Sequence, residues 1–175
     1  LRTLIEVVEK ARGSRAVILT GTGKVFSAGA ALDEVKTGLA TDPAWEILSQ
    51  TIADLPGLTI CALNGTLAGG AFGMALACDI RIAVPDARFF YPVMKMGVLP
   101  QPSDPARMKA LIGPSRTKML LMAGQKVDSQ MALRWGLIDN MTTRGGLMDH
   151  AQELAATAQT TPLSLISEIK TMIKG

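Results

Sequence analysis

The amino-acid sequence predicts an α/β fold whose later part is helical. Short apolar runs rich in β-branched residues alternate with helical patterns in residues 1–103, and almost only helical patterns follow in residues 104–175. The chain has 175 residues, 48% of them hydrophobic, which is enough to bury the core of one domain. We therefore expect a single domain, with an α/β core over 1–103 and a helical part over 104–175.

The elements of the first part follow from local patterns. An apolar face over residues 1–11 predicts an opening helix, and the run over 15–20 predicts a buried strand after it. Asp42 and Pro43 predict the start of a helix over 43–55, because a capping side chain is followed by proline at the first helical position. The same part is predicted to contain strands over 60–63, 80–84 and 88–90 and a buried helix over 70–77.

Helices are predicted over 105–112, 115–122, 129–135, 147–158 and 163–173 in the second part. Ile166, Ile169, Met172 and Ile173 give the last of them an apolar face. We expect that face to contact a further segment or a neighbouring subunit. Because the chain opens directly in a helical pattern and closes on this unpartnered apolar face, we also expect that segments of the fold are missing at both ends.

Composition and charge argue against several classes of function. The 18 basic and 15 acidic residues form no run of like charge, so nucleic acid is not an expected partner. The longest apolar stretch, over 67–78, contains three glycines and is too short to span a membrane. No cluster of His, Cys or carboxylate residues has metal-ligand spacing, so no metal is expected.

The expected location is the cytoplasm. The sequence opens without the pattern of a secretory signal. Cys61 and Cys78 lie in apolar runs that are typical of buried thiols, although a single pair of cysteines also allows a disulfide.

A glycine-rich stretch over 21–24 invites comparison with nucleotide-binding loops. A P-loop needs four residues between its glycines and a Ser or Thr after its lysine, whereas Lys24 is followed by Val25. The dinucleotide fingerprint fails as well, because no third glycine stands three residues after Gly23. The stretch is therefore predicted to be a turn.

Residues 26–32 and 64–71 give a stronger signal. Each segment joins the end of a strand, a run of small residues and the start of a helix, which exposes backbone N–H groups. If the two segments face each other, one amide from each could bind a single oxygen, and each such donor contributes about 10²- to 10³-fold in rate. The small residues can also serve only to let strand and helix pack closely, and composition alone favours this second interpretation.

The segments 15–30, 62–65, 69–70, 75–83, 97–100 and 132–139, read in this order, closely resemble the crotonase superfamily, the enoyl-CoA hydratase/isomerase family. The resemblance covers nearly the whole chain, without the family's first strands and last helices. It implies a spiral of ββα repeats that assembles as a homotrimer or a dimer of trimers. It also implies an acyl-CoA substrate, with coenzyme A as part of the substrate and no tightly bound cofactor.

The resemblance assigns residues to an acyl-CoA site. The family's two oxyanion amides, which bind the thioester oxygen, fall on Ala30 and Gly70, in the two small-residue segments. The main chain around the CoA adenine falls on Ala28, Ala30 and Leu32. Lys24 is expected to contact a CoA phosphate, although a lysine in a turn is often simply solvated.

The two glutamates of family hydratases are absent. Addition of water to a double bond needs a positioned base and acid, and these positions fall on Gly73 and Val93, which cannot carry a proton. A third position, which serves other chemistry in relatives, is Gln101, whose side chain forms hydrogen bonds but does not titrate. We expect a poor hydratase.

Tyr91 and Asp104 are the candidates to replace the glutamates. Tyr91 lies two residues before Val93, where its side chain could point to the site or to the core. Asp104 lies near the turn that carries Gln101, but its place between Ser103 and a proline, ahead of a helix, favours a role as N-cap.

Three functions follow as hypotheses. The first is an acyl-CoA lyase or isomerase in which the amides of Ala30 and Gly70 stabilise an enolate, while Tyr91, Asp104, water or the substrate itself moves the proton. The second is a catalytically weakened acyl-CoA-binding protein. The third is a structural oligomer whose glycines serve packing alone.

Overall fold

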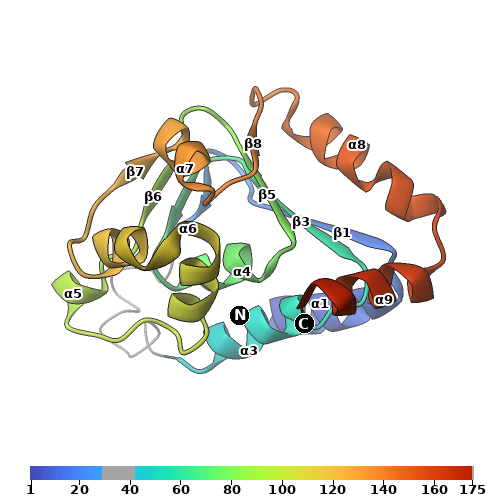
Figure 1. Cartoon of the computed structure of the whole chain (residues 1–175), viewed down its shortest axis with the longest axis horizontal. Coiled ribbons are helices and arrows are strands. Elements are labelled where there is room, and N and C mark those ends of the chain that lie inside the picture. The colour runs from blue at the N-terminus through green and yellow to red at the C-terminus, as the bar shows by residue number, and fades with distance from the viewer. Residues whose placement is uncertain (29–41, 175) are drawn as a thin grey trace.

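The computed structural model describes residues 1–28 and 42–174. Its strands form two four-stranded sheets (Figure 1). The first sheet is parallel throughout and has the order β1 (Ala16–Thr20), β3 (Leu58–Leu63), β5 (Ile80–Ala83) and β8 (Asn140–Met141). The second has the order β2 (Val25–Ser27), β4 (Thr66–Ala68), β6 (Arg88–Phe90) and β7 (Val127–Asp128), and only its last pair is antiparallel.

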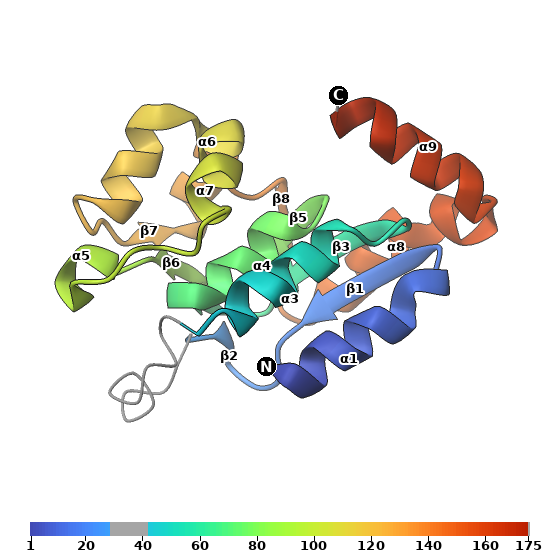
Figure 2. The same cartoon turned by 90° about the horizontal axis from the view of Figure 1, so that it is seen from below.

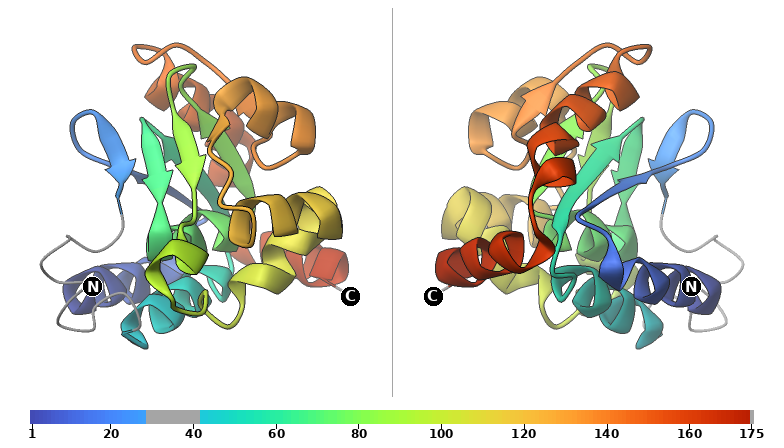
Figure 3. Two further views of the ribbon diagram at one scale, coloured as in Figure 1. Left: turned by 90° about the vertical axis from the view of Figure 1, so that its left-hand side faces the viewer. Right: turned by 90° about the vertical axis from the view of Figure 1, so that its right-hand side faces the viewer.

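The chain alternates between the two sheets. It passes from β1 to β2, from β3 to β4 and from β5 to β6, and a helical segment follows each pair. These segments include α3 (Ala44–Ala53), the 3-10 helix η3 (Gly69–Ala71) with α4 (Phe72–Ala77), and α5 (Val93–Met96). Figure 3 shows the strands of successive pairs, coloured from blue to green, side by side around the core. The predicted α/β class and the spiral of ββα repeats are confirmed.

Helices dominate the second part of the chain, as predicted. They are α6 (Asp104–Leu121), α7 (Ser129–Trp135), α8 (Leu147–Thr160) and α9 (Leu163–Lys174), while α1 (Arg2–Lys10) and the 3-10 helix η1 (Ala11–Gly13) open the chain. A break at Gly113 divides α6 into the two predicted helical pieces. Both α8 and α9 lie on the opposite side of the molecule from α5, α6 and α7 (Figures 1 and 2).

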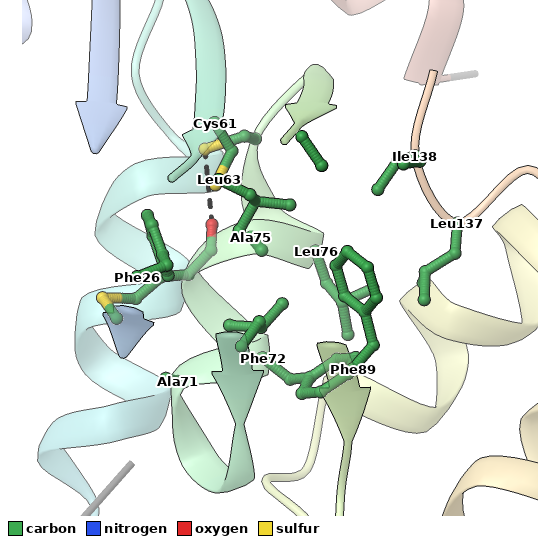
Figure 4. Close-up of a cluster of buried hydrophobic side chains, with 14 of the residues drawn as sticks. Phe26, Cys61, Leu63, Ala71, Phe72, Ala75, Leu76, Phe89, Leu137 and Ile138 are labelled. Carbon is green, nitrogen blue, oxygen red and sulfur yellow. Dashed lines mark hydrogen bonds between the residues drawn. The ribbon is translucent and has the colours of Figure 1, made fainter. Parts of the chain in front are cut away.

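The core forms around α4, which packs against α3 and α6 and has all six residues buried. Figure 4 shows Phe72 and Leu76 of this helix directed toward Phe89 of β6 and Leu137. The small residues at the start of the helix, such as Ala71, let it approach α3 closely. Because every residue of α4 is buried, the helix is held in place, and this fixes the position of the Gly69–Gly70 turn that precedes it.

The two cysteines are buried free thiols, so the disulfide alternative is excluded. Cys78 Sγ donates a hydrogen bond to the Met74 carbonyl oxygen at 3.3 Å, and burial raises the pKa of Cys61 well above its usual range (Figure 4). Among the described residues, no helix is long and apolar enough to cross a membrane. Residues 1–28 and 42–174 also contain no group of three or more His, Cys, Asp or Glu side chains arranged to hold a metal ion.

Candidate active site

Asn64 fixes the loop between β1 and β2 to the turn after β3. Its Oδ1 accepts a hydrogen bond from the Gly21 N–H at 3.1 Å, and its Nδ2 donates to the carbonyl oxygens of Gly23 and Val25 at 3.0 and 3.2 Å. The next residue, Gly65, lies against the same loop. The described start of the first small-residue segment therefore lies beside β4, which is part of the second segment.

The residues expected around CoA are only partly described. A Cβ at Gly65 would lie 2.0 Å from the Lys24 carbonyl oxygen, so the backbone of Lys24 is fixed by a contact that only glycine permits. Lys24, which directly precedes β2, and Ala28, which directly follows it, are exposed. Ala30, the first expected oxyanion amide, and Leu32 lie outside the described residues.

Gly70, the second expected oxyanion amide, lies in the turn between β4 and α4. The turn uses the left-handed region at Gly69, with φ of 60°, and both glycines are partly exposed although Ala68 and Ala71 are buried. Since Gly70 is the second residue of η3, its N–H belongs to a first turn, where donors lack intrahelical partners. A Cβ at Gly70 would lie 3.1 Å from the Trp45 indole, which covers the α-carbon side of the turn.

Gln101, Tyr91 and Asp104 form one hydrogen-bonded cluster. The Tyr91 hydroxyl donates to Asp104 Oδ2 at 2.9 Å and accepts from the Gln101 N–H at 3.3 Å. Its ring stacks on Phe72 with 5.3 Å between centroids. The ring of Tyr91 therefore lies in the core, and its hydroxyl contacts a carboxyl group. The structure brings together these three predicted site residues, which lie up to 13 positions apart.

The prediction that Asp104 caps α6 is wrong. Ser103 is the N-cap residue, and no side-chain capping bond is made at this helix start. Glu46 of α3 binds this helix start instead. Its Oε2 accepts hydrogen bonds from the Ser103 N–H and Oγ at 3.2 and 3.1 Å, and a carboxylate is favourable near a helix N-terminus. The Asp104 side chain is thus free to turn inward to Tyr91, and it is 0% exposed.

Asp104 Oδ1 has no hydrogen-bond partner among the described residues, unlike Oδ2. It lies 3.0 Å from the point that a Cβ at Gly73 would occupy. Gly73 is the first of the two expected glutamate positions, and Val93, the second, is buried at the start of α5. A carboxyl group therefore stands beside Gly73, although it comes from α6 and not from α4.

Burial raises the pKa of Asp104 to about 7, against the hydrogen bond from Tyr91, which lowers it. The nearby Glu46 raises this pKa further and Arg107 lowers it. Burial and the charge of Asp104 raise the pKa of Tyr91 well above its usual value, so the phenol stays protonated at neutral pH. Asp104 thus titrates near pH 7, where a carboxyl group can both accept and return a proton.

Sequence reasoning missed three polar residues around the cluster, Glu46, Ser49 and Arg107. The Ser49 hydroxyl donates to the Gly73 carbonyl oxygen at 3.1 Å and accepts from Arg107 Nη1. Ser49 stands four residues after Trp45 on the buried face of α3, and it is 0% exposed. A serine on the apolar face of a predicted helix was the signal that could have found it.

Known proteins resemble this chain along most of its length. A sequence model described as "Enoyl-CoA hydratase/isomerase" matches residues 1–174. Carnitinyl-CoA dehydratase of Citrobacter koseri is 37% identical over 146 residues, which cover 81% of this chain and 56% of the relative. The chain therefore spans little more than half the length of that curated relative.

Solved structures agree with this match. The enoyl-CoA hydratase of Bacillus anthracis has a TM-score of 0.90 at 26% identity, over 99% of this chain and 71% of that one. DspI of Pseudomonas aeruginosa has a TM-score of 0.88 at 31% identity, over 98% and 69% of the two chains. Together with the family match over residues 1–174, these likenesses show that the chain belongs to the enoyl-CoA hydratase/isomerase family, the crotonase superfamily.

Proposed function

We propose that this protein binds an acyl-CoA thioester and polarises its carbonyl group through main-chain hydrogen bonds, as an enzyme of the lyase or isomerase type. The observation that carries the proposal is the Gly69–Gly70 turn, which is partly exposed at the start of an otherwise buried helix. The N–H of Gly70 supplies one donor, and Ala30 is the proposed source of the second. Membership of the family, and a relative named for a CoA thioester, support this choice of substrate.

The chemistry follows from where charge develops. Removal of a proton next to a thioester moves negative charge onto the thioester oxygen, and fixed N–H donors stabilise that charge by about 10²- to 10³-fold in rate each. The Trp45 indole beside Gly70 keeps the turn apolar on one side, which strengthens such hydrogen bonds. Lys24 and the main chain at Ala28 are the proposed contacts of the CoA phosphate and adenine.

A catalytically weakened acyl-CoA-binding protein is the second candidate function. It is favoured by Gly73 and Val93, because neither residue can transfer the protons that hydration requires. Both candidates require binding of an acyl-CoA, whereas a structural oligomer requires none.

Calorimetric titration of the purified protein with butyryl-CoA tests the proposal. We expect saturable binding, and we expect Lys24→Met to weaken it roughly fivefold because one phosphate loses an exposed cation. Lys118→Met, which removes an exposed lysine on α6, is the matched control and leaves the affinity unchanged. Absence of binding by the unaltered protein would refute both acyl-CoA functions.

A hydration assay separates enzyme from weakened relative. We expect crotonyl-CoA to be hydrated several decades more slowly than by a hydratase with both glutamates, because a positioned acid or base contributes about 10²- to 10⁴-fold each. A rate equal to that of such a hydratase would show that the acid and base stand elsewhere than at positions 73 and 93.

The proposal extends to assembly in the cytoplasm as a trimer or a dimer of trimers, with α9 in the subunit contact. Leu165, Ile169, Met172 and Ile173 of this helix are 47%, 49%, 81% and 81% exposed. An apolar face of this kind is typical of an interaction surface. Sedimentation of the purified protein tests this part, and a monomer at micromolar concentration would contradict it.

A further inference from the structure

We propose that Asp104 is the proton-transfer group of this site and that Tyr91 is the residue that positions it. The inference rests on the acyl-CoA function proposed above and assigns the group that removes and returns the proton on the carbon next to the thioester. It is carried by the geometry of one carboxyl group, in which one oxygen accepts a hydrogen bond from Tyr91 and the other has no partner in the part of the chain that the structure describes.

The unpartnered oxygen is unusual for a folded protein. A buried polar atom without a hydrogen bond costs about 1–3 kcal/mol, and buried carboxyl oxygens are nearly always satisfied. Asp104 Oδ1 is the only buried side-chain nitrogen or oxygen atom without a partner in residues 1–28 and 42–174. Such an atom suits a group whose partner is a substrate.

The position of Oδ1 relative to Gly70 fits a thioester. Gly70 and Gly73 lie three residues apart along the continuous η3–α4 segment, so they share one helical face and lie about 5–6 Å apart. A thioester oxygen bonded to the Gly70 N–H would lie about 3 Å from that nitrogen. Its neighbouring carbon, two bonds further on, would then come toward Gly73, where Oδ1 stands 3.0 Å from the Cβ position.

Helix α3 closes this space in the described structure. Its Trp45 packs against Gly70 and its Ser49 packs against Gly73, with Cβ positions 3.1 and 3.2 Å from the two side chains. Since Asp104 is 0% exposed, the inference requires α3 to yield when a thioester binds. Both contacts come from one helix, so a single displacement would expose both glycines.

Tyr91 holds the carboxyl group in the required orientation. The Gln101 N–H donates to the Tyr91 oxygen, which leaves the phenolic proton to point at Asp104 Oδ2. The ring is fixed by stacking on Phe72. With Oδ2 bound in this way, Oδ1 is the oxygen directed to the helix that carries Gly73. Tyr91 itself stays protonated and serves no other step.

The charges around the carboxyl group suit reversible proton transfer. The titratable and charged groups that act on Asp104 are Tyr91 after β6, Glu46 on α3 and Arg107 on α6. With burial they bring the pKa of Asp104 to about 7, so that the carboxylate and the acid are both populated near neutral pH.

The step balances within the substrate and this one side chain. Carboxylate Oδ1 forms a bond to the α-proton while the C–H bond breaks. The electron pair of that C–H bond moves to the thioester oxygen and gives an enolate. Return of a proton from Oδ1 to the same carbon restores the thioester. In deuterated water the carboxyl proton exchanges with solvent, so each cycle can place deuterium on the α-carbon.

Mass spectrometry of butyryl-CoA incubated with the protein in deuterated water measures this step, as the rate of hydrogen exchange at the α-carbon. The measurement does not depend on hydration of a double bond. We expect the unaltered protein to catalyse exchange with a rate that rises with pH and levels off above about pH 7, where Asp104 is ionised. Asp104→Asn should lower the rate at least 100-fold and remove this inflection. Asp149→Asn, an exposed aspartate on α8, is the matched control and should exchange normally.

Calorimetry on the same samples distinguishes the inference from the function beneath it. Binding of butyryl-CoA with no exchange, or equal exchange by Asp104→Asn and the unaltered protein, overturns the role of Asp104 and leaves acyl-CoA binding intact. Absence of binding by the unaltered protein overturns both.

Tyr91→Phe gives an independent arm if Asp104→Asn does not fold. The hydrogen bond from Tyr91 lowers the pKa of Asp104, so its loss should move the inflection to higher pH and reduce the rate. An unshifted inflection in a folded Tyr91→Phe protein would overturn the positioning role.

Discussion

Two charged side chains buried next to α4 differ in how their polar atoms are satisfied. Arg81 of β5 is 4% exposed, and its guanidinium donates to the carbonyl oxygens of Cys78 and Leu137 at 2.6 and 3.1 Å and to Asp139 Oδ2 at 3.3 Å. Asp104 is 0% exposed, and one of its oxygens has no partner among the described residues.

The difference separates a structural charge from a candidate functional one. Arg81 ties the end of α4 to the chain segment before β8 and satisfies carbonyl groups that burial would otherwise leave unpaired. Within residues 1–28 and 42–174, Asp104 makes a single side-chain hydrogen bond, and its pKa is raised to about 7. A buried group that is fully satisfied stabilises the fold, whereas one that is half satisfied lowers stability and keeps chemistry available.

The largest expected effect is on stability, when Arg81 is replaced by Met. The variant keeps an apolar stem of similar length but leaves at least two buried carbonyl oxygens without donors, so we expect a loss of about 3–5 kcal/mol. Urea denaturation measures it. Arg12→Met, which removes an exposed arginine paired with Glu9, is the matched control and should unfold like the unaltered protein. Equal stability of the two variants would remove the distinction between Arg81 and a surface charge.

The longer elements of the fold could be predicted from local patterns. The strand β1, the helix α7 and the break in α6 all lie where apolar runs and periodicity indicated them. The prediction that this first strand is buried is wrong, because β1 is an edge strand whose residues are partly or fully exposed. The strands β2, β4, β7 and β8 have only two or three residues each, which is too short for a period to be visible. Their pairing depends on contacts such as that of Asn64 with the loop before β2, which join distant parts of the chain.

The candidate site was predictable in its residues but not in its geometry. Gln101 was found from the family resemblance, Tyr91 because it lies two residues before Val93, and Asp104 because it lies near the turn that carries Gln101. The direction of the Asp104 side chain could not be predicted, because a local capping signal competed with a tertiary contact. Glu46 on α3 binds the start of α6 in place of Asp104. Nothing in the order of residues indicates that α3 lies against that turn.

A second prediction concerns how stability depends on pH. The pKa of an aspartate is about 3.9 in an unfolded chain and about 7 at Asp104 in the folded protein, so the folded state binds the proton more tightly. The stabilisation is fully present below about pH 4 and is lost as the pH rises through about 7. Relative to Asp104→Asn, the unaltered protein should lose about 2–4 kcal/mol between pH 4 and pH 8.

Urea denaturation at the two pH values checks this result, and any constant packing cost of the Asp104→Asn substitution cancels in the comparison. Asp149→Asn should show no such difference from the unaltered protein, since its carboxyl group is exposed. A gap between Asp104→Asn and the unaltered protein that does not change with pH would show that Asp104 titrates as an ordinary aspartate.

The smallest effect on stability is expected for Gly73→Ala, which adds a methyl group next to the buried Asp104 carboxyl group. The added Cβ would lie 3.0 Å from Asp104 Oδ1 and 3.2 Å from the Ser49 Cβ, so the neighbours must shift by a few tenths of an ångström. The gain of about 1 kcal/mol from alanine in a helix offsets that strain, and the net change should stay below about 1 kcal/mol.

Hydrogen exchange into butyryl-CoA should nevertheless fall about tenfold in Gly73→Ala, because the methyl group covers the oxygen that must reach the substrate. Gly13→Ala, at a position with no atom within 4 Å of the new Cβ, should leave both quantities unchanged. Normal exchange by a stable Gly73→Ala protein would mean that the substrate does not approach Asp104 across Gly73.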